Sequence, residues 1–354
     1  MFSLNKSRLI TAFLALFVGA ILLAAASAFF VNAWLHKPMN LQNEKVLAIQ
    51  PGDTMGKIAY RLASDDVLNY PKLFILYAKF TEQTHLEVGE YRLPANITPK
   101  QFLSELRSGD VVTYSVTLVE GLTFKNFLEI LKKQEKIVTT LNNEASSKTA
   151  FQQLKEKLKL DIEHPEGWFY PDTYQYVANT NDVDILLQAH KKMQRVLAEE
   201  WENKAKNLPY KNAYEALTMA SIVEKETGVA YERPEIAGVF VRRLQKGMRL
   251  QTDPTIIYGL GDSYKGNIRR KHLRQPTPYN TYVIDGLPPT PIAMPGRDAI
   301  HAALHPKAGK TLFFVAKGDG SHQFSETLKQ HNRAVQKYQI QKRAKNYRSA
   351  PASN

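Results

Sequence analysis

An uncharged apolar segment near the start of the sequence restricts the fold more than any other feature. Residues 9–35 contain no charged side chain and are mostly Leu, Ala, Phe, Ile and Val. A helix needs about 20 such residues to cross a bilayer. A signal peptide has a shorter apolar core, and although residues 24–28 resemble a cleavage site, the apolar run continues to Trp34. We therefore predict that residues 9–35 form a retained transmembrane helix.

The basic residues before this segment predict its orientation. Lys6 and Arg8 precede the apolar run, and basic residues collect on the cytoplasmic side of a membrane. Residues 1–8 are then cytoplasmic. The rest of the chain is periplasmic, because no later run is long and apolar enough to cross again. We therefore predict a single-pass protein of the inner membrane.

The composition limits the chemistry that the periplasmic part can perform. The chain has no Cys, which excludes disulfides, thiol catalysis and Cys-based metal sites. Its net charge of +13 is compatible with nucleic acid. A periplasmic location instead favours an anionic bilayer or an anionic wall polymer, and we expect no nucleic-acid partner.

Familiar metal and nucleophile motifs do not occur in the sequence. His301 and His305 are four residues apart and can face one metal ion from a helix, yet no third ligand stands at a recognised spacing. The sequence has neither a phosphate-binding P-loop nor a G-x-S-x-G elbow. We predict no metal, no cofactor and no serine nucleophile.

The length of 354 residues favours two folded units. The first is predicted over residues 46–110, and its elements are a strand at 46–49, the segment PGDT at 51–54, a helix through Leu62, a helix at 72–80 and a strand at 90–93. This order resembles a LysM domain, a small module that binds N-acetylglucosamine polymers. PGDT is also favourable turn and capping chemistry, so a purely structural role remains an alternative.

A helix with an apolar body is predicted over residues 210–227. Asn212 can cap its start, with Glu215 three residues later, which is similar to a capping box. Gly228 stands where a glycine often ends a helix. The apolar residues between these ends predict that the helix is buried.

Two carboxylates, Glu224 and Glu226, lie in the last turn of this helix. The negative end of the helix dipole and an apolar environment both raise a carboxyl pKa, which is what a general acid needs at neutral pH. At about 100° per residue the two side chains point about 200° apart. We therefore expect at most one of them to face a groove. The alternative is an ordinary solvated helix end.

An aromatic and acidic stretch precedes this helix at residues 164–176. It contains Glu166, Trp168, Tyr170 and Asp172 among prolines and a glycine, so it cannot be one regular element. Aromatic faces stack on sugar rings, and acids hold hydroxyl groups. The stretch therefore predicts a sugar-binding surface, with an aromatic cluster beneath a loop as the alternative.

Several motifs in fixed order resemble the YceG-like family. The matching segments are EGWFYPDTY at 166–174, ASIVEKET at 220–227, LQTDPT at 250–255, YNTY at 279–282 and the proline-rich run at 286–296. The resemblance implies cleavage inside peptidoglycan glycan strands, between N-acetylmuramic acid and N-acetylglucosamine, leaving 1,6-anhydro ends. Such cleavage is expected to terminate the elongation of nascent strands.

The resemblance also implies roles for individual residues. The family's catalytic position matches Glu224, which follows apolar residues in the helix. One carboxyl suffices for this reaction, because the nucleophile is the 6-hydroxyl of the same sugar. The expected substrate-binding residues are Glu166, Trp168, Tyr170, Asp172, Gln251, Asp253, Asn280 and Tyr282. Bracing of the loops is an open alternative for each polar residue. Glu226 is expected to form an ion pair with Arg242 or Arg243.

The predicted fold is α+β and has several segments. They are the cytoplasmic residues 1–8, the transmembrane helix 9–35, the LysM-like unit 46–110, a connecting subdomain 111–160, a catalytic domain 161–328, and a basic helix and tail 329–354. The expected partners are peptidoglycan glycan strands, the inner membrane, and peptidoglycan synthases of the elongation or division machinery. A glycan-binding scaffold without activity and a true glycoside hydrolase are the alternative functions.

Overall fold

The structure is a computed structural model that describes residues 6–141 and 146–341. Contacts between residues divide the chain into two units, with residues 115–176 and everything after residue 179 in the second. The prediction of a mixed α+β chain with one N-terminal apolar helix is confirmed. The predicted segments 1–8 and 329–354 lie only partly within the described residues.

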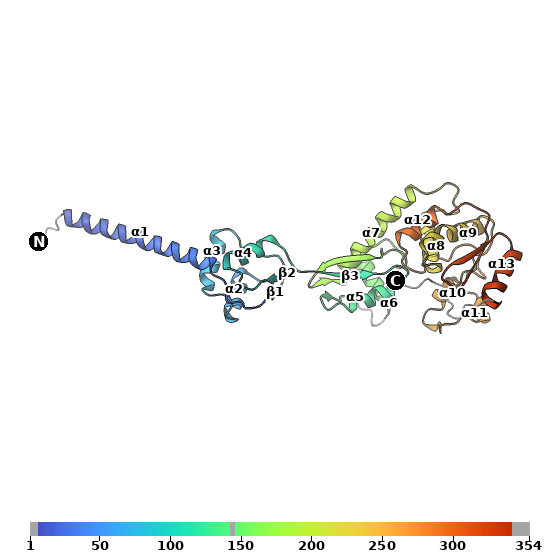
Figure 1. Cartoon of the computed structure of the whole chain (residues 1–354), viewed down its shortest axis with the longest axis horizontal. Helices are drawn as coiled ribbons and strands as arrows, with labels where there is room; N and C mark the ends of the chain where they lie inside the picture. Colours follow the sequence, from blue (N-terminus) through green and yellow to red (C-terminus); the bar gives the residue numbers. More distant parts are fainter. Residues whose placement is uncertain (1–5, 142–145, 342–354) are drawn as a thin grey trace. The chain divides into compact units, whose positions relative to one another are not determined.

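Helix α1 (Lys6–His36) begins the first unit (Figure 1). Its segment Ile10–His36 is long and apolar enough to cross a membrane, and its most apolar window is not buried by the protein. Its C-terminal end joins a protein core through the buried residues Trp34 and Leu35 and the partly buried Val31. Most of the apolar surface of α1 is therefore exposed.

The remainder of the first unit alternates strands and helices. Its elements are β1 (Lys45–Ile49), α2 (Met55–Ser64), α3 (Pro71–Phe80), β2 (Gly89–Leu93) and α4 (Pro99–Ser108). The two strands pair antiparallel, with Leu47 opposite Tyr91. The hydroxyl of Thr54 accepts the N–H of Lys57 and so caps α2, as its sequence favours. The strand–helix–helix–strand order agrees with the prediction, and the LysM-like assignment stays a prediction.

The second unit combines helices with short strand pairs. Its strands are β3 (Thr113–Leu118), β4 (Ile137–Val138), β5 (Asp172–Val177), β6 (Thr180–Asn181), β7 (Phe313–Ala316) and β8 (His322–Ser325). Its α-helices are α5 (Phe124–Lys132), α6 (Ser147–Leu158), α7 (Asp182–Glu202), α8 (Ala213–Glu226), α9 (Arg233–Gln245), α10 (Asp253–Leu260), α11 (Arg270–Arg274), α12 (Arg297–Leu304) and α13 (Leu328–Val335). Short 3-10 helices η1 (Ala230–Glu232) and η2 (Gly261–Ser263) and the π-helix η3 (Gln336–Gln341) complete it.

Helix α8 forms the centre of the second unit. Residues 216–223 are all buried, and helices α7, α9 and α12 pack against it (Figure 1). A helix that is apolar on every side is stable only inside a core. The hydroxyl of the buried Ser221 accepts the N–H of Ile292 at 3.0 Å and thereby ties the proline-rich loop to α8.

The two ends of α8 differ in how well the sequence predicts them. At the start, Asn212 Oδ1 accepts the N–H of Glu215 at 3.0 Å, as predicted, while the Glu215 carboxylate accepts the N–H of Lys211. At the other end, Thr227 adopts an extended conformation and Gly228 has no positive φ. The expected glycine cap is therefore wrong, because Thr227 already ends the helix.

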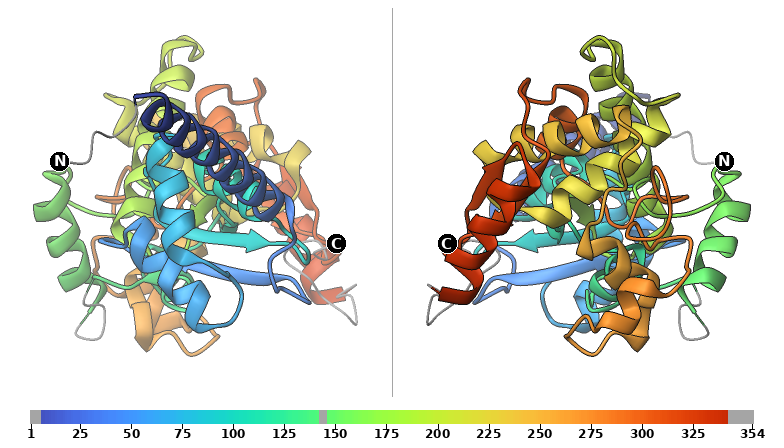
Figure 2. Two further views of the ribbon diagram at one scale, coloured as in Figure 1. Left: turned by 90° about the vertical axis from the view of Figure 1, so that its left-hand side faces the viewer. Right: turned by 90° about the vertical axis from the view of Figure 1, so that its right-hand side faces the viewer.

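A hairpin and the last α-helix cover one side of the second unit. Strands β7 and β8 pair antiparallel, with Val315 opposite Gln323. Helix α13 packs against both strands (Figure 2). Phe314 places its ring edge on Phe240 of α9, with ring centres 5.6 Å apart. The hairpin is thus fixed to the helices that surround α8.

Candidate active site

A cavity of about 930 Å³ lies within the second unit. Residues from distant parts of the chain line this cavity. Among them are Glu120, Glu224, Glu226, Gln251, Asp253, Tyr282, Phe314 and His322. The cavity includes the last residues of α8 and the segment that follows them. The cavity therefore lies at the C-terminal end of α8 rather than along one face of this helix.

Glu224 is held in a nearly buried position, with 7% of its side chain exposed. Its Oε2 accepts the N–H of Gly296 at 2.9 Å, and Arg233 Nη2 donates to its Oε1 at 3.4 Å. The other terminal nitrogen of Arg233 lies 3.4 Å from Asp298. One backbone donor and one guanidinium thus fix the carboxyl group at the cavity.

The pKa of Glu224 is raised above the ordinary glutamate value, as the sequence predicts. Burial is the largest cause, because it disfavours the charged form. The N–H of Gly296 and the charge of Arg233 lower the pKa, whereas the charge of Glu120 raises it. The group therefore keeps its proton to a higher pH than an ordinary glutamate does.

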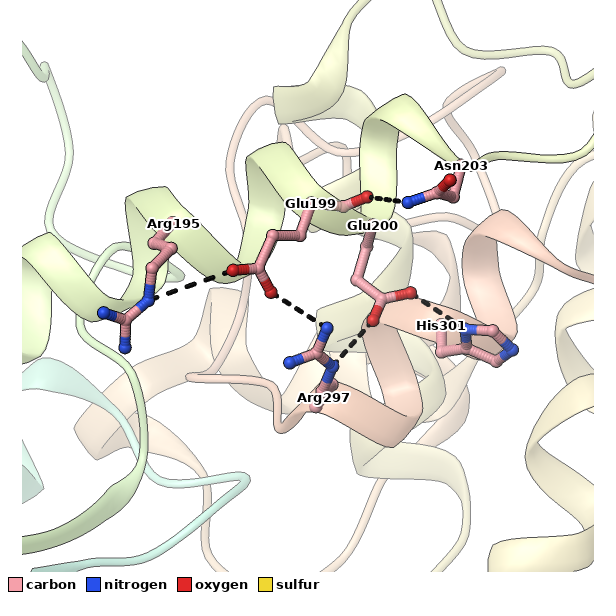
Figure 3. A network of polar contacts seen from close by, with 6 residues as sticks. All are labelled: Arg195, Glu199, Glu200, Asn203, Arg297 and His301. Carbon is pink, nitrogen blue, oxygen red and sulfur yellow. Dashed lines mark hydrogen bonds and ion pairs between the residues drawn. The ribbon is translucent and has the colours of Figure 1, made fainter.

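The loop that carries Gly296 is anchored to α7 through the next residue (Figure 3). Arg297 Nε donates to Glu200 at 2.7 Å, and Arg297 Nη2 donates to Glu199 at 3.0 Å. His301 Nδ1 lies 2.8 Å from the second oxygen of Glu200. This network fixes the start of α12 and hence the N–H that faces Glu224.

Glu120 is a second carboxylate near Glu224 that sequence reasoning missed. A Cβ atom on Gly296 would lie 2.8 Å from Cγ of Glu120 and 3.5 Å from Oε2 of Glu224. A Cβ atom at position 296 would therefore displace the exposed Glu120 side chain, whereas its distance to Glu224 is an ordinary contact. The sequence shows Glu120 only as part of a turn, and 104 positions separate it from Glu224, so no local pattern connects them.

Glu226 bonds to a threonine. Thr252 Oγ1 donates to Glu226 Oε1. Burial raises the pKa of Glu226 to about 7, the bond from Thr252 lowers it, and the charge of Asp253 raises it. The expectation that at most one of the two acids faces a groove is wrong, since Glu224 and Glu226 both line the cavity. The physical reason is that the cavity surrounds the helix end.

The predicted ion pair of Glu226 with Arg242 or Arg243 is also wrong. Arg242 donates to the carbonyls of Lys307 and Thr311. Arg243 donates to the carbonyls of residues 249, 250 and 312. Both guanidiniums bind backbone oxygens because these loops pass over α9 and leave carbonyls without strand or helix partners.

Three predicted substrate-binding residues line the cavity together. They are Gln251, Asp253 and Tyr282. The Tyr282 hydroxyl donates to Asp253 Oδ1 at 2.7 Å. Gln251 has a positive φ of 53°, and its N–H donates to the carbonyl of Thr281 at 3.1 Å. The structure therefore brings these residues to the same cavity as Glu224.

Asn280 supports the loop next to these residues. It is 1% exposed, and its Nδ2 donates to the carbonyls of His272 and Gln275. Its Oδ1 accepts the N–H of Tyr282 at 3.1 Å. Asn280 is not among the residues that line the cavity, and its contacts orient Tyr282.

The remaining predicted residues also lie outside the cavity lining. Both carboxylate oxygens of the buried Glu166 accept the N–H of Phe124, and burial raises the pKa of Glu166 to about 8. Trp168 stacks on Tyr214, with ring centres 5.7 Å apart.

Tyr170 and Asp172 complete this group. Asp172 forms an ion pair with Lys192. The Tyr170 hydroxyl meets the backbone N–H of Arg297, which belongs to the loop beside Glu224. Tyr170 therefore contacts the loop next to Glu224 but does not line the cavity itself.

Comparison with known proteins assigns the family. A model of the YceG-like family matches residues 47–337. The chain belongs to the YceG-like family. An endolytic murein transglycosylase of Bacillus subtilis strain 168 is 30% identical over 334 residues, which cover 89% of this chain and 91% of that protein.

Two further relatives agree with this YceG-like assignment. An endolytic murein transglycosylase of Streptococcus pneumoniae serotype 2 strain D39 is 26% identical, covering 92% of this chain and 65% of that protein. A crystal structure of a YceG-like protein from Listeria monocytogenes is 30% identical and has a TM-score of 0.50. It covers 82% of this chain and 99% of the crystallised chain.

The YceG-like chain also carries a histidine cluster that the sequence shows only in part. Glu200, His301 and His305 place nitrogen and oxygen atoms within 4.8 Å of one another. Glu200 is the third potential metal ligand of this cluster, and no spacing in the sequence indicated it. Its carboxylate is already bound by Arg297 and His301 (Figure 3).

Proposed function

We propose that this YceG-like protein is an endolytic peptidoglycan lytic transglycosylase with Glu224 as its catalytic acid. The observation that carries the proposal is a nearly buried glutamate with a raised pKa on the wall of a large cavity. The names of the relatives in Bacillus subtilis and Streptococcus pneumoniae support this reaction class. The cavity of about 930 Å³ lies at the upper end of the range of about 300–1,000 Å³ that is typical of pockets for drug-sized ligands, which is compatible with a short glycan segment.

The reaction needs one carboxyl that acts twice. Protonated Glu224 donates its proton to the glycosidic oxygen, and the bond from this oxygen to C1 of N-acetylmuramic acid breaks. The 6-hydroxyl oxygen of the same sugar forms a new bond to C1. The Glu224 carboxylate takes the hydroxyl proton, and a 1,6-anhydro end remains. No water is consumed, and the acid returns to its initial state.

The contacts of Glu224 fit both halves of this cycle. Burial favours the protonated acid that starts the reaction. The N–H of Gly296 and the guanidinium of Arg233 stabilise the carboxylate after the proton has left. Gln251, Asp253 and Tyr282 are the proposed sugar contacts, because they line the same cavity. Glu166, Trp168, Tyr170, Asp172 and Asn280 are proposed to support the surrounding loops.

A true hydrolase is the second candidate, and Glu120 is the observation that favours it. Glycosidases that use water carry two carboxylates across the scissile bond, and Glu120 approaches the same glycine as Glu224. The product decides between the two reactions. Mass spectrometry of digested peptidoglycan shows anhydro ends for the lyase, reducing ends for the hydrolase and no cleavage for a scaffold.

The cellular role in this proposal follows from the membrane helix. α1 spans the inner membrane once, with residues 1–8 in the cytoplasm and the catalytic unit in the periplasm. Cleavage near the membrane then terminates the elongation of nascent glycan strands. The LysM-like unit is proposed to hold N-acetylglucosamine, and peptidoglycan synthases are the proposed protein partners. The length and apolar composition of α1 support the anchor.

The test is the variant Glu224→Gln, compared with Glu226→Gln in the same helix. Glutamine keeps the size of the side chain, but its amide group is not acidic enough to transfer a proton to the leaving oxygen. We expect Glu224→Gln to lose cleavage of purified peptidoglycan by at least about 100-fold, in line with the usual contribution of a general acid. Glu226→Gln should lose much less, and both variants should melt within a few degrees of wild type. Full activity of Glu224→Gln would exclude the assignment.

A further inference from the structure

His322 lies in a carboxylate–histidine pair that the proposed reaction does not use. Its side chain and that of Glu232 are each 5% exposed. Glu232 Oε1 accepts the backbone N–H of His322 at 2.9 Å, and Oε2 lies 2.8 Å from His322 Nδ1. A buried pair with this geometry fixes the position and the hydrogen bonding of the imidazole.

The pair determines which ring nitrogen carries the proton. The backbone N–H of His322 can only donate, so Glu232 serves it as an acceptor. The second oxygen of the same carboxylate is also an acceptor, and Nδ1 must therefore be the N–H nitrogen. In the neutral ring Nε2 then carries a lone pair. Among the described residues, the side-chain hydrogen bond of the ring is made by Nδ1 and not by Nε2.

The ring is held by aromatic neighbours and borders the cavity. Phe314 packs edge-on against His322, with ring centres 5.4 Å apart and planes at 88°. Phe324 lies at 6.5 Å on the same hairpin. His322 lines the cavity that Glu224 also lines. His322 is therefore an imidazole held in a fixed orientation at the wall of the proposed glycan site.

Glu232 and Arg233 connect this acceptor to the proposed acid. The two residues are consecutive at the start of α9: Glu232 binds His322, and Arg233 binds Glu224. One short backbone segment thus positions both side chains. This arrangement suits a site in which the sugar must be held in a fixed relation to the acid.

We propose that His322 Nε2 accepts a hydrogen bond from a hydroxyl group of a glycan strand bound in this cavity, and that Glu232 sets the required tautomer. Hydroxyl groups are the most numerous donors on such a strand and rotate toward a fixed acceptor. The inference rests on the proposed function for the identity of the ligand. His322 is a substrate-binding residue here, and Glu232 is a positioning residue.

The variant Glu232→Gln tests the tautomer. The amide oxygen can still accept the backbone N–H of His322, which leaves the amide NH₂ facing Nδ1. Nδ1 must then accept, and the proton moves to Nε2, which becomes a donor toward the cavity. ¹⁵N chemical shifts of the labelled imidazole report this exchange directly. Unchanged shifts in Glu232→Gln would overturn the role of Glu232.

Binding is measured with the full chain in detergent and with peptide-free glycan strands of alternating N-acetylglucosamine and N-acetylmuramic acid. The Glu224→Gln background prevents cleavage. We expect Glu232→Gln and His322→Phe each to weaken binding about 3- to 10-fold, as the loss of one hydrogen bond predicts. Gln323→Ala, on the next residue of β8, is the control and should leave affinity unchanged.

The outcomes separate this inference from the proposed function. Unchanged affinity in Glu232→Gln, with the tautomer exchanged, would overturn the contact at Nε2 even where cleavage by wild type is normal. With Glu224 intact, KM should rise in Glu232→Gln while the pH dependence of kcat stays the same, because His322 transfers no proton. A shifted pH profile would overturn the binding role. If the wild-type protein binds strands without cleaving them, the proposed lyase activity is refuted and the contact at His322 is not.

Discussion

At the scale of single residues, the environment gives the same side chain different properties. Glu166, Glu224 and Glu226 all have raised pKa values, and burial is the largest cause for each. Their hydrogen-bond partners differ. Glu166 accepts a backbone N–H at the start of a helix, Glu224 accepts a guanidinium N–H and a backbone N–H, and Glu226 accepts a threonine hydroxyl. Of these, the Glu224 pair best stabilises a charge that appears during a reaction.

Variants at Arg233 and Glu120 should move the pH profile in opposite directions. The charge of Arg233 lowers the pKa of Glu224, and the charge of Glu120 raises it. Arg233→Gln should therefore shift the alkaline limb of kcat/KM to higher pH, and Glu120→Gln should shift it to lower pH, each by up to about one unit. The profile is measured on peptide-free glycan strands. Shifts in the same direction would contradict the assignment of Glu224 as the acid.

At the scale of elements, α8 depends on its cap as well as on its core. The Asn212 side chain satisfies an N–H that the first turn of the helix leaves free. We expect Asn212→Ala to lower the free energy of unfolding by about 1 kcal/mol. Urea denaturation measures the change. Lys211→Ala is the matched control, because Lys211 contributes only its backbone N–H, and an equal loss in both variants would count against capping.

At the scale of the whole molecule, the buried carboxyls make stability depend on pH. The folded pKa of Glu166 is about 8, against 4.5 for the free side chain. Between these values the folded state holds more protons than the unfolded state, so stability falls as pH rises, by up to about 1.4 kcal/mol per pH unit. Stability from this group is fully present below about pH 4.5 and is lost as pH rises through about 8.

The variant Glu166→Gln should reduce this dependence. Relative to wild type, it should gain stability steadily between pH 5 and pH 8, as measured by urea denaturation in detergent at fixed salt. The exposed Glu156→Gln is the control and should follow wild type. Parallel curves for wild type and Glu166→Gln would show that Glu166 does not keep its proton in the folded protein.

Features that depend on neighbouring residues could be predicted from the sequence. The apolar segment at residues 9–35, the cap of α8 and the strand–helix–helix–strand order of the first unit follow from local hydrophobicity and hydrogen bonding. The raised pKa of Glu224 was also predictable, because an apolar helix predicts burial.

The distant groups that meet at the site could not be predicted in this way, because their contacts depend on the tertiary fold. Glu120, Arg233 and Gly296 surround Glu224, although they come from separate segments of the chain. Glu232 and His322 meet across 90 positions in the same way. Local patterns carry no information on such contacts, because they arise from the packing of whole helices and hairpins around α8.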